Sequence, residues 1–270
     1  MKYFIDTEFL EGTQNKNFLG MNVGKTKPTI DLISIGIVSE DNRAYYAISK
    51  DFNLKEAWNR FDWATDNSSI NKNYKIGNLK RYKVYWIREN VLKPIFVELA
   101  EKDNNSYFDF CKYKHTSSPD ILKSVANVDK FTYRNLKKLI NKYGKTNKQI
   151  AEEIKEFVKK DYLYKNADTT TQWKDRGNPE FYAYYADYDW VAFCWLFGKM
   201  IDLPNGFPMY CIDLKQELER LNETLGYNCD AKGKSYRLQE KPNYPKQTNA
   251  HNALADARWN YELYKFLNTL

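Results

Sequence analysis

Apolar residues gather near the start of the chain in three short segments that predict β-strands. Residues 2–10 (KYFIDTEFL) and 43–49 (RAYYAIS) mix apolar and polar positions, whereas residues 30–38 (IDLISIGIV) are nearly all apolar. A strand that is apolar throughout is buried on both faces, so residues 30–38 are predicted to be central in a sheet. With a turn at residues 40–42, the three segments predict a β-meander.

The rest of the chain alternates between helical and strand patterns. Apolar residues recur with helical spacing at residues 86–100, where Pro94 is expected to kink or break the helix, and at residues 133–143. A capping box at residues 146–149 begins a further helix that extends through Val158. Beyond it, the pattern predicts strands at 181–186 and 208–214, helices at 190–197, 215–225 and 252–267, and loops at 11–29, 165–180 and 226–247. This order predicts an α/β fold, in which a mixed sheet carries helices on both faces.

The composition is that of a folded chain without a membrane segment. Apolar residues make up 43% and charged residues 29% of the 270 positions, and the sequence contains no 18-residue apolar run. Because its first residues already read as a strand, we expect no signal peptide. The four cysteines show no paired CxxC spacing, so they are expected to be reduced thiols. We therefore expect one cytoplasmic, intracellular domain spanning residues 1–270, with no membrane partner.

Positive charge is concentrated in the middle of the chain. The net charge is +7, and residues 71–145 contain 17 Lys/Arg against 7 Asp/Glu. We interpret residues 59–145, and 101–145 above all, as a basic, partly helical insertion in the core fold. Clustered cations are typical of proteins that bind a phosphate backbone, and we expect the insertion to contact nucleic acid upstream of the reacting end. The alternative is a lysine-rich solvated surface.

Two carboxylates on the first strand are the first candidate site. Asp6 and Glu8 are two residues apart, so in a strand they point to the same face. Neighbouring acids repel each other unless a cation lies between them, and Mg²⁺ prefers oxygen ligands. The alternative is a solvated acid beside a helix-capping acid, and these residues alone do not decide between the two readings.

Three residues further along complete the candidate constellation. Asp189, with Asp187 as its competitor, lies where a predicted strand meets a helix, and α/β proteins place ligands at such strand ends. His251 and Asp256 lie at the start of the last helix, among alanines that permit close approach to the sheet. Four carboxylates can hold two divalent ions for phosphodiester hydrolysis, and an imidazole can accept a proton near neutral pH.

With these residues in order, the sequence resembles the DEDDh 3′→5′ exonucleases. That superfamily includes RNase T, oligoribonuclease and the proofreading exonuclease of DNA polymerase. The resemblance is closer to the polyadenylate-specific 3′-exoribonuclease AS family of bacteria and phages. It is carried by YFIDTEF at 3–9, LISIG at 32–36, YYAIS at 45–49, YDWVA at 188–192 and HNALADAR at 251–258. It covers both ends of the chain but not residues 59–83 or 101–145.

The resemblance implies an RNase H-like fold with a mixed five-stranded sheet, and hydrolysis that releases nucleoside monophosphates from 3′ ends. It implies two divalent ions, Mg²⁺ or Mn²⁺, held by four carboxylates, Asp6, Glu8, Asp189 and Asp256, with His251 as general base. The sister subclass has a tyrosine where this chain has Asn252, which favours the histidine subclass. Asp187 is interpreted as a helix N-terminal charge.

The sequence leaves several alternatives open. Phe9 and Trp190 are candidate base-stacking residues and equally good candidates for the core. The competing functions are a nucleic-acid-binding module with a vestigial nuclease site and an RNase H-like endonuclease. The expected partner is the 3′ end of RNA or of single-stranded DNA, and the oligomeric state, including a homodimer, stays open.

Overall fold

The computed structural model describes residues 1–19, 21–65, 81–103, 130–159, 163–165, 171–173, 178–224, 228–229 and 235–270. The chain divides into two compact units. The first contains Met1–Thr13, Lys27–Phe52 and Gly144–Leu270, and the second contains Gln14–Thr26 and Asn53–Tyr143. The limits of the expected insertion stay a prediction, and its residues 104–129 lie outside the described part.

A mixed five-stranded sheet forms the centre of the first unit, as the described residues show it. Its strands are β1 (Lys2–Gly12), β4 (Thr29–Ser39), β5 (Ala44–Ile48), β10 (Glu180–Ala183) and β11 (Ile212–Asp213), in the order β11-β10-β1-β4-β5. The β1–β4 and β4–β5 pairs are antiparallel, whereas β10 is parallel to both β1 and β11. The predicted meander and mixed sheet are confirmed, and the arrangement is that of an RNase H-like α/β fold.

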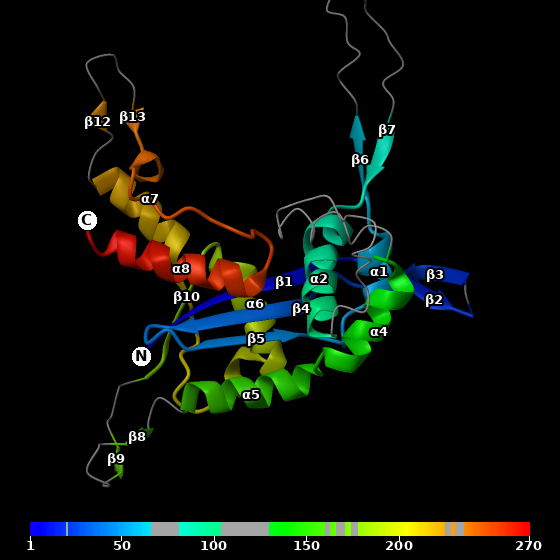
Figure 1. Cartoon of the computed structure of the whole chain (residues 1–270), viewed down its shortest axis with the longest axis horizontal. Helices are drawn as coiled ribbons and strands as arrows, with labels where there is room; N and C mark the ends of the chain where they lie inside the picture. The colour runs from blue at the N-terminus through cyan, green and yellow to red at the C-terminus, as the bar shows by residue number, and fades with distance from the viewer. Residues whose placement is uncertain are drawn as a thin grey trace, which may run out of the picture. The chain divides into compact units, whose positions relative to one another are not determined.

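Helices cover both faces of this sheet (Figure 1). On one face lie α8 (Ala253–Leu267) and α7 (Leu214–Thr224), where Phe4 shares a core with Leu263. On the other face lie α5 (Asn147–Lys159) and α6 (Ala186–Phe197), where Ile5 shares a core with Phe193. Because side chains alternate along a strand, the residues of β1 with even numbers point toward α8. That rule directs Asp6 and Glu8 to the α8 face.

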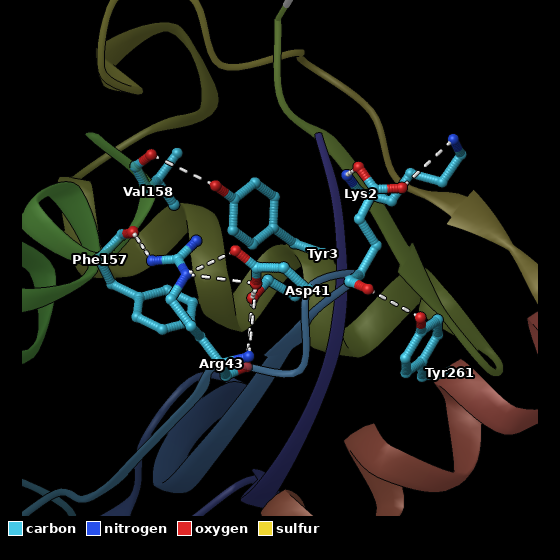
Figure 2. Close-up of polar contacts among 9 residues, drawn as sticks. Lys2, Tyr3, Asp41, Arg43, Phe157, Val158 and Tyr261 are labelled. Carbon is cyan, nitrogen blue, oxygen red and sulfur yellow. Dashed lines mark hydrogen bonds and ion pairs between the residues drawn. The ribbon is translucent and has the colours of Figure 1, made fainter. Parts of the chain in front are cut away.

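Polar contacts fasten β1 and the turn between β4 and β5 to helices on both faces (Figure 2). The Tyr3 hydroxyl donates to the Val158 carbonyl at 3.2 Å, and Arg43 Nη1 donates to the Phe157 carbonyl at 3.0 Å. On the opposite face, the Tyr261 hydroxyl of α8 donates to the Glu40 carbonyl at 2.8 Å. These bonds link β1 to α5, and the turn between β4 and β5 to both α5 and α8, and so limit how far either helix can move.

The second unit packs two helices together. α2 (Lys93–Lys102) and α4 (Tyr133–Tyr143) contact each other and bury apolar side chains, among them Phe96 and Leu136. The other elements of this unit are α1 (Leu54–Asn59), the π-helical turn η1 (Arg88–Leu92), and the hairpins β2–β3 (Asn15–Phe18, Met21–Lys25) and β6–β7 (Asp62–Thr65, Arg81–Val84).

Short hairpins overlap three segments that the sequence predicts as loops. They are β2–β3, β8–β9 (Leu163–Lys165, Thr171–Trp173) and β12–β13 (Asn228–Cys229, Ser235–Tyr236). The loop predictions are therefore wrong for β2–β3, β9 and β12–β13, whereas β8 lies almost wholly before the predicted loop at 165–180. The physical reason is that strands of two to five residues are too short to show the alternation from which strands are recognised. Two 3₁₀ turns, η4 (Met200–Asp202) and η5 (Leu238–Glu240), complete the described elements.

Two predicted element boundaries also differ from the structure. α6 begins at Ala186 and not at residue 190, because Asp213 accepts hydrogen bonds from the backbone N–H groups of Tyr185 and Ala186. Asp187 and Asp189 therefore both lie in the first turn of α6. The helix predicted at residues 86–100 is not broken at Pro94. The π-helical turn η1 leads into α2 with Pro94 in its first turn, where a missing N–H costs little.

Candidate functional site

A pocket of about 320 Å³ opens in the first unit where β1, α6 and α8 meet. It is lined by all five residues that the sequence singles out for catalysis, namely Asp6, Glu8, Asp189, His251 and Asp256. Phe9 also lines it. Three segments far apart in the sequence therefore converge on one cavity.

The carboxylates of Asp6, Glu8 and Asp256 form the tightest group in this pocket. One ligand oxygen from each lies within 4.8 Å of the others. Asp6 and Glu8 come from the even face of β1, and Asp256 comes from the first turn of α8, which lies over that face. Oxygen atoms this close can share a single hard cation.

Gly36 permits this close approach of α8. It lies opposite Asp6 on β4, and a Cβ atom at this position would lie 2.5 Å from Leu254 Cα and closer still to the carbonyl group of Ala253. All of these are backbone atoms at the start of α8, so no change of rotamer could relieve the overlap. The sequence analysis missed this role, although a glycine inside a strongly apolar strand is a signal of close backbone approach.

Asp189 is fixed by the strand on which Asp6 and Glu8 lie. Its Oδ1 accepts the backbone N–H of Thr7 at 2.8 Å and the Thr7 hydroxyl at 2.5 Å. Asp189 is 6% exposed, whereas Asp187, two residues earlier in the same helical turn, is exposed and does not line the pocket. The structure therefore brings Asp189, and not Asp187, to the other acids. Thr7 was also missed, because it lies between the two acids without a distinctive spacing.

His251 and Gln247 hold the carboxylate of Asp256 from the segment before α8. The backbone N–H of His251 donates to Asp256 Oδ2 at 2.8 Å, and Gln247 Nε2 donates to Oδ1 at 2.5 Å. His251 has a φ of 68°, a left-handed conformation that is uncommon for a residue with a Cβ atom. Such a conformation persists only where the surroundings enforce it, and here it places the histidine in the pocket lining.

Asn260 joins α8 directly to β1. Its Nδ2 donates to the Ile5 carbonyl at 2.8 Å, and the side chain is 1% exposed. This bond fixes the helix against the strand one turn beyond Asp256. A buried asparagine four residues after a candidate ligand on the same helical face was an available sequence signal.

Burial raises the pKa of all four carboxyl groups, and repulsion by neighbouring carboxylates raises it further for Asp6, Glu8 and Asp189. For Asp6 burial is the main cause of a pKa well above the usual range, and Asp189, Glu8 and Asp256 add to it. Burial, with Asp256 and Asp189, raises the pKa of Glu8 to about 8. Burial also raises the pKa of Asp189 to about 7, against the hydrogen bonds from Thr7, and burial raises the pKa of Asp256.

The described lining of the pocket contains no lysine or arginine. Four carboxyl groups therefore share a described lining without Lys or Arg, so the full set of ionised forms is unfavourable unless a cation enters. The donor set of carboxylate oxygens suits Mg²⁺ or Mn²⁺.

Aromatic side chains also line the pocket. Phe9 lies against Tyr188 with ring centroids 5.6 Å apart, and both line the cavity. Tyr185, which is 63% exposed and has a φ of 58°, lines it as well. Trp190 is 8% exposed and stacks on Phe193 at 4.9 Å, so it packs in the core and does not line the pocket.

A second cavity, of about 380 Å³, shares Trp259 with the first. Its lining includes Lys246 and Arg258, and neither makes an ion pair with another described residue. The candidate site therefore has a cationic neighbour on α8, although its own lining is acidic.

Comparison with known proteins supports part of this picture. No protein-family model matches the chain. Two curated proteins of Mycobacterium tuberculosis, from strains CDC 1551 and H37Rv, are both named 3′-5′ exoribonuclease and are 44% identical to the chain over 57 residues. That stretch covers 21% of this chain and 26% of each relative, so the match spans about a quarter of the length of these relatives. Among the described residues no helix is both long and apolar enough to cross a membrane.

Proposed function

We propose that the chain is a metal-dependent 3′→5′ exoribonuclease of the DEDDh class, similar to the polyadenylate-specific 3′-exoribonuclease AS proteins. The observation that carries the proposal is the convergence of Asp6, Glu8 and Asp256, with oxygens within 4.8 Å, in a pocket that Asp189 and His251 also line. The resemblance of the motifs and the name of the two partial relatives support the same activity.

In this proposal, Asp6, Glu8, Asp189 and Asp256 hold two divalent ions, Mg²⁺ or Mn²⁺. Such ions would supply a water of lowered pKa and would stabilise the leaving 3′ oxygen. The protein supports the ligands with neutral donors. Thr7 directs one oxygen of Asp189, while Gln247 and the His251 backbone hold both oxygens of Asp256. Hydrogen-bonded ligands of this kind keep their orientation.

His251 is proposed as the general base. It lines the same cavity as the four acids, and its backbone bond to Asp256 fixes the main chain next to the ligand. A base must lie within hydrogen-bonding reach of the proton that it removes, directly or through a water. The imidazole would remove the proton of the attacking water.

The aromatic side of the pocket is proposed to receive the 3′-terminal base. Phe9 and Tyr188 form a tilted pair that lines the cavity, and Tyr185 offers a further exposed ring. A base that stacks on an aromatic ring gains about 1–3 kcal/mol. Lys246 and Arg258 in the neighbouring cavity would contact upstream phosphates.

Degradation of a 5′-labelled single-stranded RNA tests the proposal. With Mg²⁺ the wild-type protein should produce a ladder that shortens from the 3′ end, and both EDTA and Asp6→Asn should abolish it. Wild-type protein that gives no ladder, or an unchanged ladder with Asp6→Asn, contradicts the proposal. A matched DNA oligonucleotide, single-stranded and with a 3′ overhang on a duplex, assigns the sugar and strand preference.

The same assay separates the two alternative functions. A circular RNA has no 3′ end, so the proposed exonuclease leaves it intact, whereas an RNase H-like endonuclease cuts it. A binding module with a vestigial site would bind the linear RNA in a salt-dependent manner and never shorten it with any divalent ion.

A further inference from the structure

The hairpin β6–β7 of the second unit exposes aromatic rings and cations together. It is a two-stranded antiparallel ribbon (Figure 1), and two of its large side chains are exposed, Trp63 by 54% and Tyr82 by 52%. Arg81 and Lys83 are exposed on the same strand as Tyr82. None of these residues belongs to the pocket of the first unit.

The register of the hairpin places these residues on two different faces. Trp63 lies opposite Lys83, and Thr65 lies opposite Arg81. Residues that face each other across a ladder, and residues two apart along a strand, share a face. Trp63, Arg81 and Lys83 therefore lie on one face, and Tyr82 lies on the other.

Rings and cations alternate along the Trp63 face. Phe61, just before β6, lies edge-on to Trp63 with ring centroids 5.5 Å apart and lies 5.9 Å from Tyr85. The Lys83 ammonium lies 4.1 Å from the centroid of Phe61 and 5.7 Å from that of Trp63, and the Arg81 guanidinium lies 5.6 Å from Trp63. The face is a row of three aromatic rings with two cations beside it.

The cations of this row have no carboxylate partner among the described residues. Neither Arg81 nor Lys83 makes an ion pair with a described carboxylate, and the only acid of the ribbon's described strands, Asp62, lies on the other face. The backbone ladder between β6 and β7 already holds the hairpin together, and the cation–π contacts add to it. Neither kind of contact explains why more than half of the Trp63 side chain remains exposed to water.

We infer that this face binds single-stranded nucleic acid. A base would stack on the exposed indole of Trp63, while Arg81 and Lys83 would contact the phosphates on either side. Exposed aromatic rings flanked by cations are the features by which proteins hold single strands without reading their sequence. The net positive charge of residues 71–145 favours a polyanion. The choice of nucleic acid as partner rests on the proposed function, whereas the surface lies outside the proposed catalytic site.

Fluorescence anisotropy with a labelled single-stranded RNA of about 20 nucleotides tests the inference. The measurements use the full chain with Asp6→Asn, so that the RNA is not consumed. Trp63→Ala should raise the Kd about 10-fold, and Trp63→Phe, which keeps a ring, should restore most of the affinity. Arg81→Gln with Lys83→Gln should lower the slope of log Kd against log salt concentration by about 1.4, the contribution of two phosphate contacts on a single strand.

Tyr82→Ala is the matched control, because Tyr82 is equally exposed on the same ribbon but lies on the opposite face. Its Kd should equal that of the Asp6→Asn protein. Unchanged binding by Trp63→Ala, an equal loss with Tyr82→Ala, or displacement of the RNA by polyglutamate at equal charge would overturn the inference. Polyglutamate displacement would assign the face to an acidic protein partner.

Hydrolysis of a dinucleotide distinguishes failure of the binding inference from failure of the proposed catalytic function. In the otherwise wild-type chain, Trp63→Ala should leave dinucleotide turnover unchanged, because the substrate is too short to need the hairpin. If the wild-type protein hydrolyses no substrate, the proposed catalytic function fails, and the anisotropy still decides whether the hairpin binds RNA.

Discussion

The substitution Gly36→Ala perturbs the site without changing any residue proposed to act in it. The added Cβ would lie 2.5 Å from Leu254 Cα, whereas carbon atoms in contact are separated by about 3.5–4.0 Å. The start of α8 must therefore move away from β4 by about 1 Å. Asp256 lies in the first turn of that helix, so its carboxylate moves away from Asp6 by a similar distance.

Two quantities should change in this variant. Overpacking of this kind costs about 1–3 kcal/mol in the free energy of unfolding, which urea denaturation measures. A misplacement of about 1 Å at a reacting centre can lower the rate about 10²-fold, which steady-state hydrolysis of labelled RNA measures. We expect both effects, with the larger one on kcat/KM.

Ile37→Val is the control for stability. Ile37 is fully buried in the core on the α5 and α6 face, so its truncation costs about 0.5–1.5 kcal/mol without moving α8. This variant should keep wild-type kcat/KM. If Gly36→Ala also keeps wild-type kcat/KM, α8 does not lie against β4 as described, and the reasoning is refuted.

Three further predictions concern the same pocket. In EDTA the free energy of unfolding should fall as pH rises from about 4.5 to about 8, because the raised pKa of Glu8 keeps it protonated only in the folded state. Mg²⁺ should remove that fall, so urea denaturation should show more stabilisation by Mg²⁺ at pH 8 than at pH 5. Equal stabilisation at the two pH values would contradict the raised pKa of Glu8. Thr7→Val removes one of the two hydrogen bonds to Asp189 and should lower kcat about 10-fold with little change in KM; an unchanged kcat would show that the hydroxyl does not support the ligand. Asn260→Leu leaves a buried carbonyl at Ile5 without this donor and should cost about 1–3 kcal/mol in urea denaturation, whereas a loss below 0.5 kcal/mol, roughly the level of an ordinary surface substitution, would argue against the bond.

The periodicity of the sequence was sufficient to predict the sheet and most of the helices. The meander and the later strands follow from apolar runs that a buried strand requires. The spacing of Asp6 and Glu8 also predicted their common face, because that spacing depends only on the local geometry of a strand. These predictions succeeded where local pattern and tertiary packing require the same residues.

Features that depend on contacts between distant segments could not be predicted in this way. The bonds from Thr7 to Asp189 and from Asn260 to Ile5 join residues far apart in the sequence, so a local pattern does not show which partner each residue meets. Trp190 illustrates the same limit, since an aromatic residue beside a candidate ligand can face the pocket or the core, and only packing decides. The short hairpins were missed because strands of two to five residues are too short to show a clear alternating pattern.

The site assignment is tested most directly by substituting, one at a time, the two aspartates in the first turn of α6. Asp189→Asn and Asp187→Asn remove the same charge two residues apart, but only Asp189 is buried in the pocket. In degradation of 5′-labelled RNA with Mg²⁺, Asp189→Asn should lower the rate by at least about 100-fold, and Asp187→Asn should keep the wild-type rate. Equal rates for the two variants, or a greater loss with Asp187→Asn, would contradict the account.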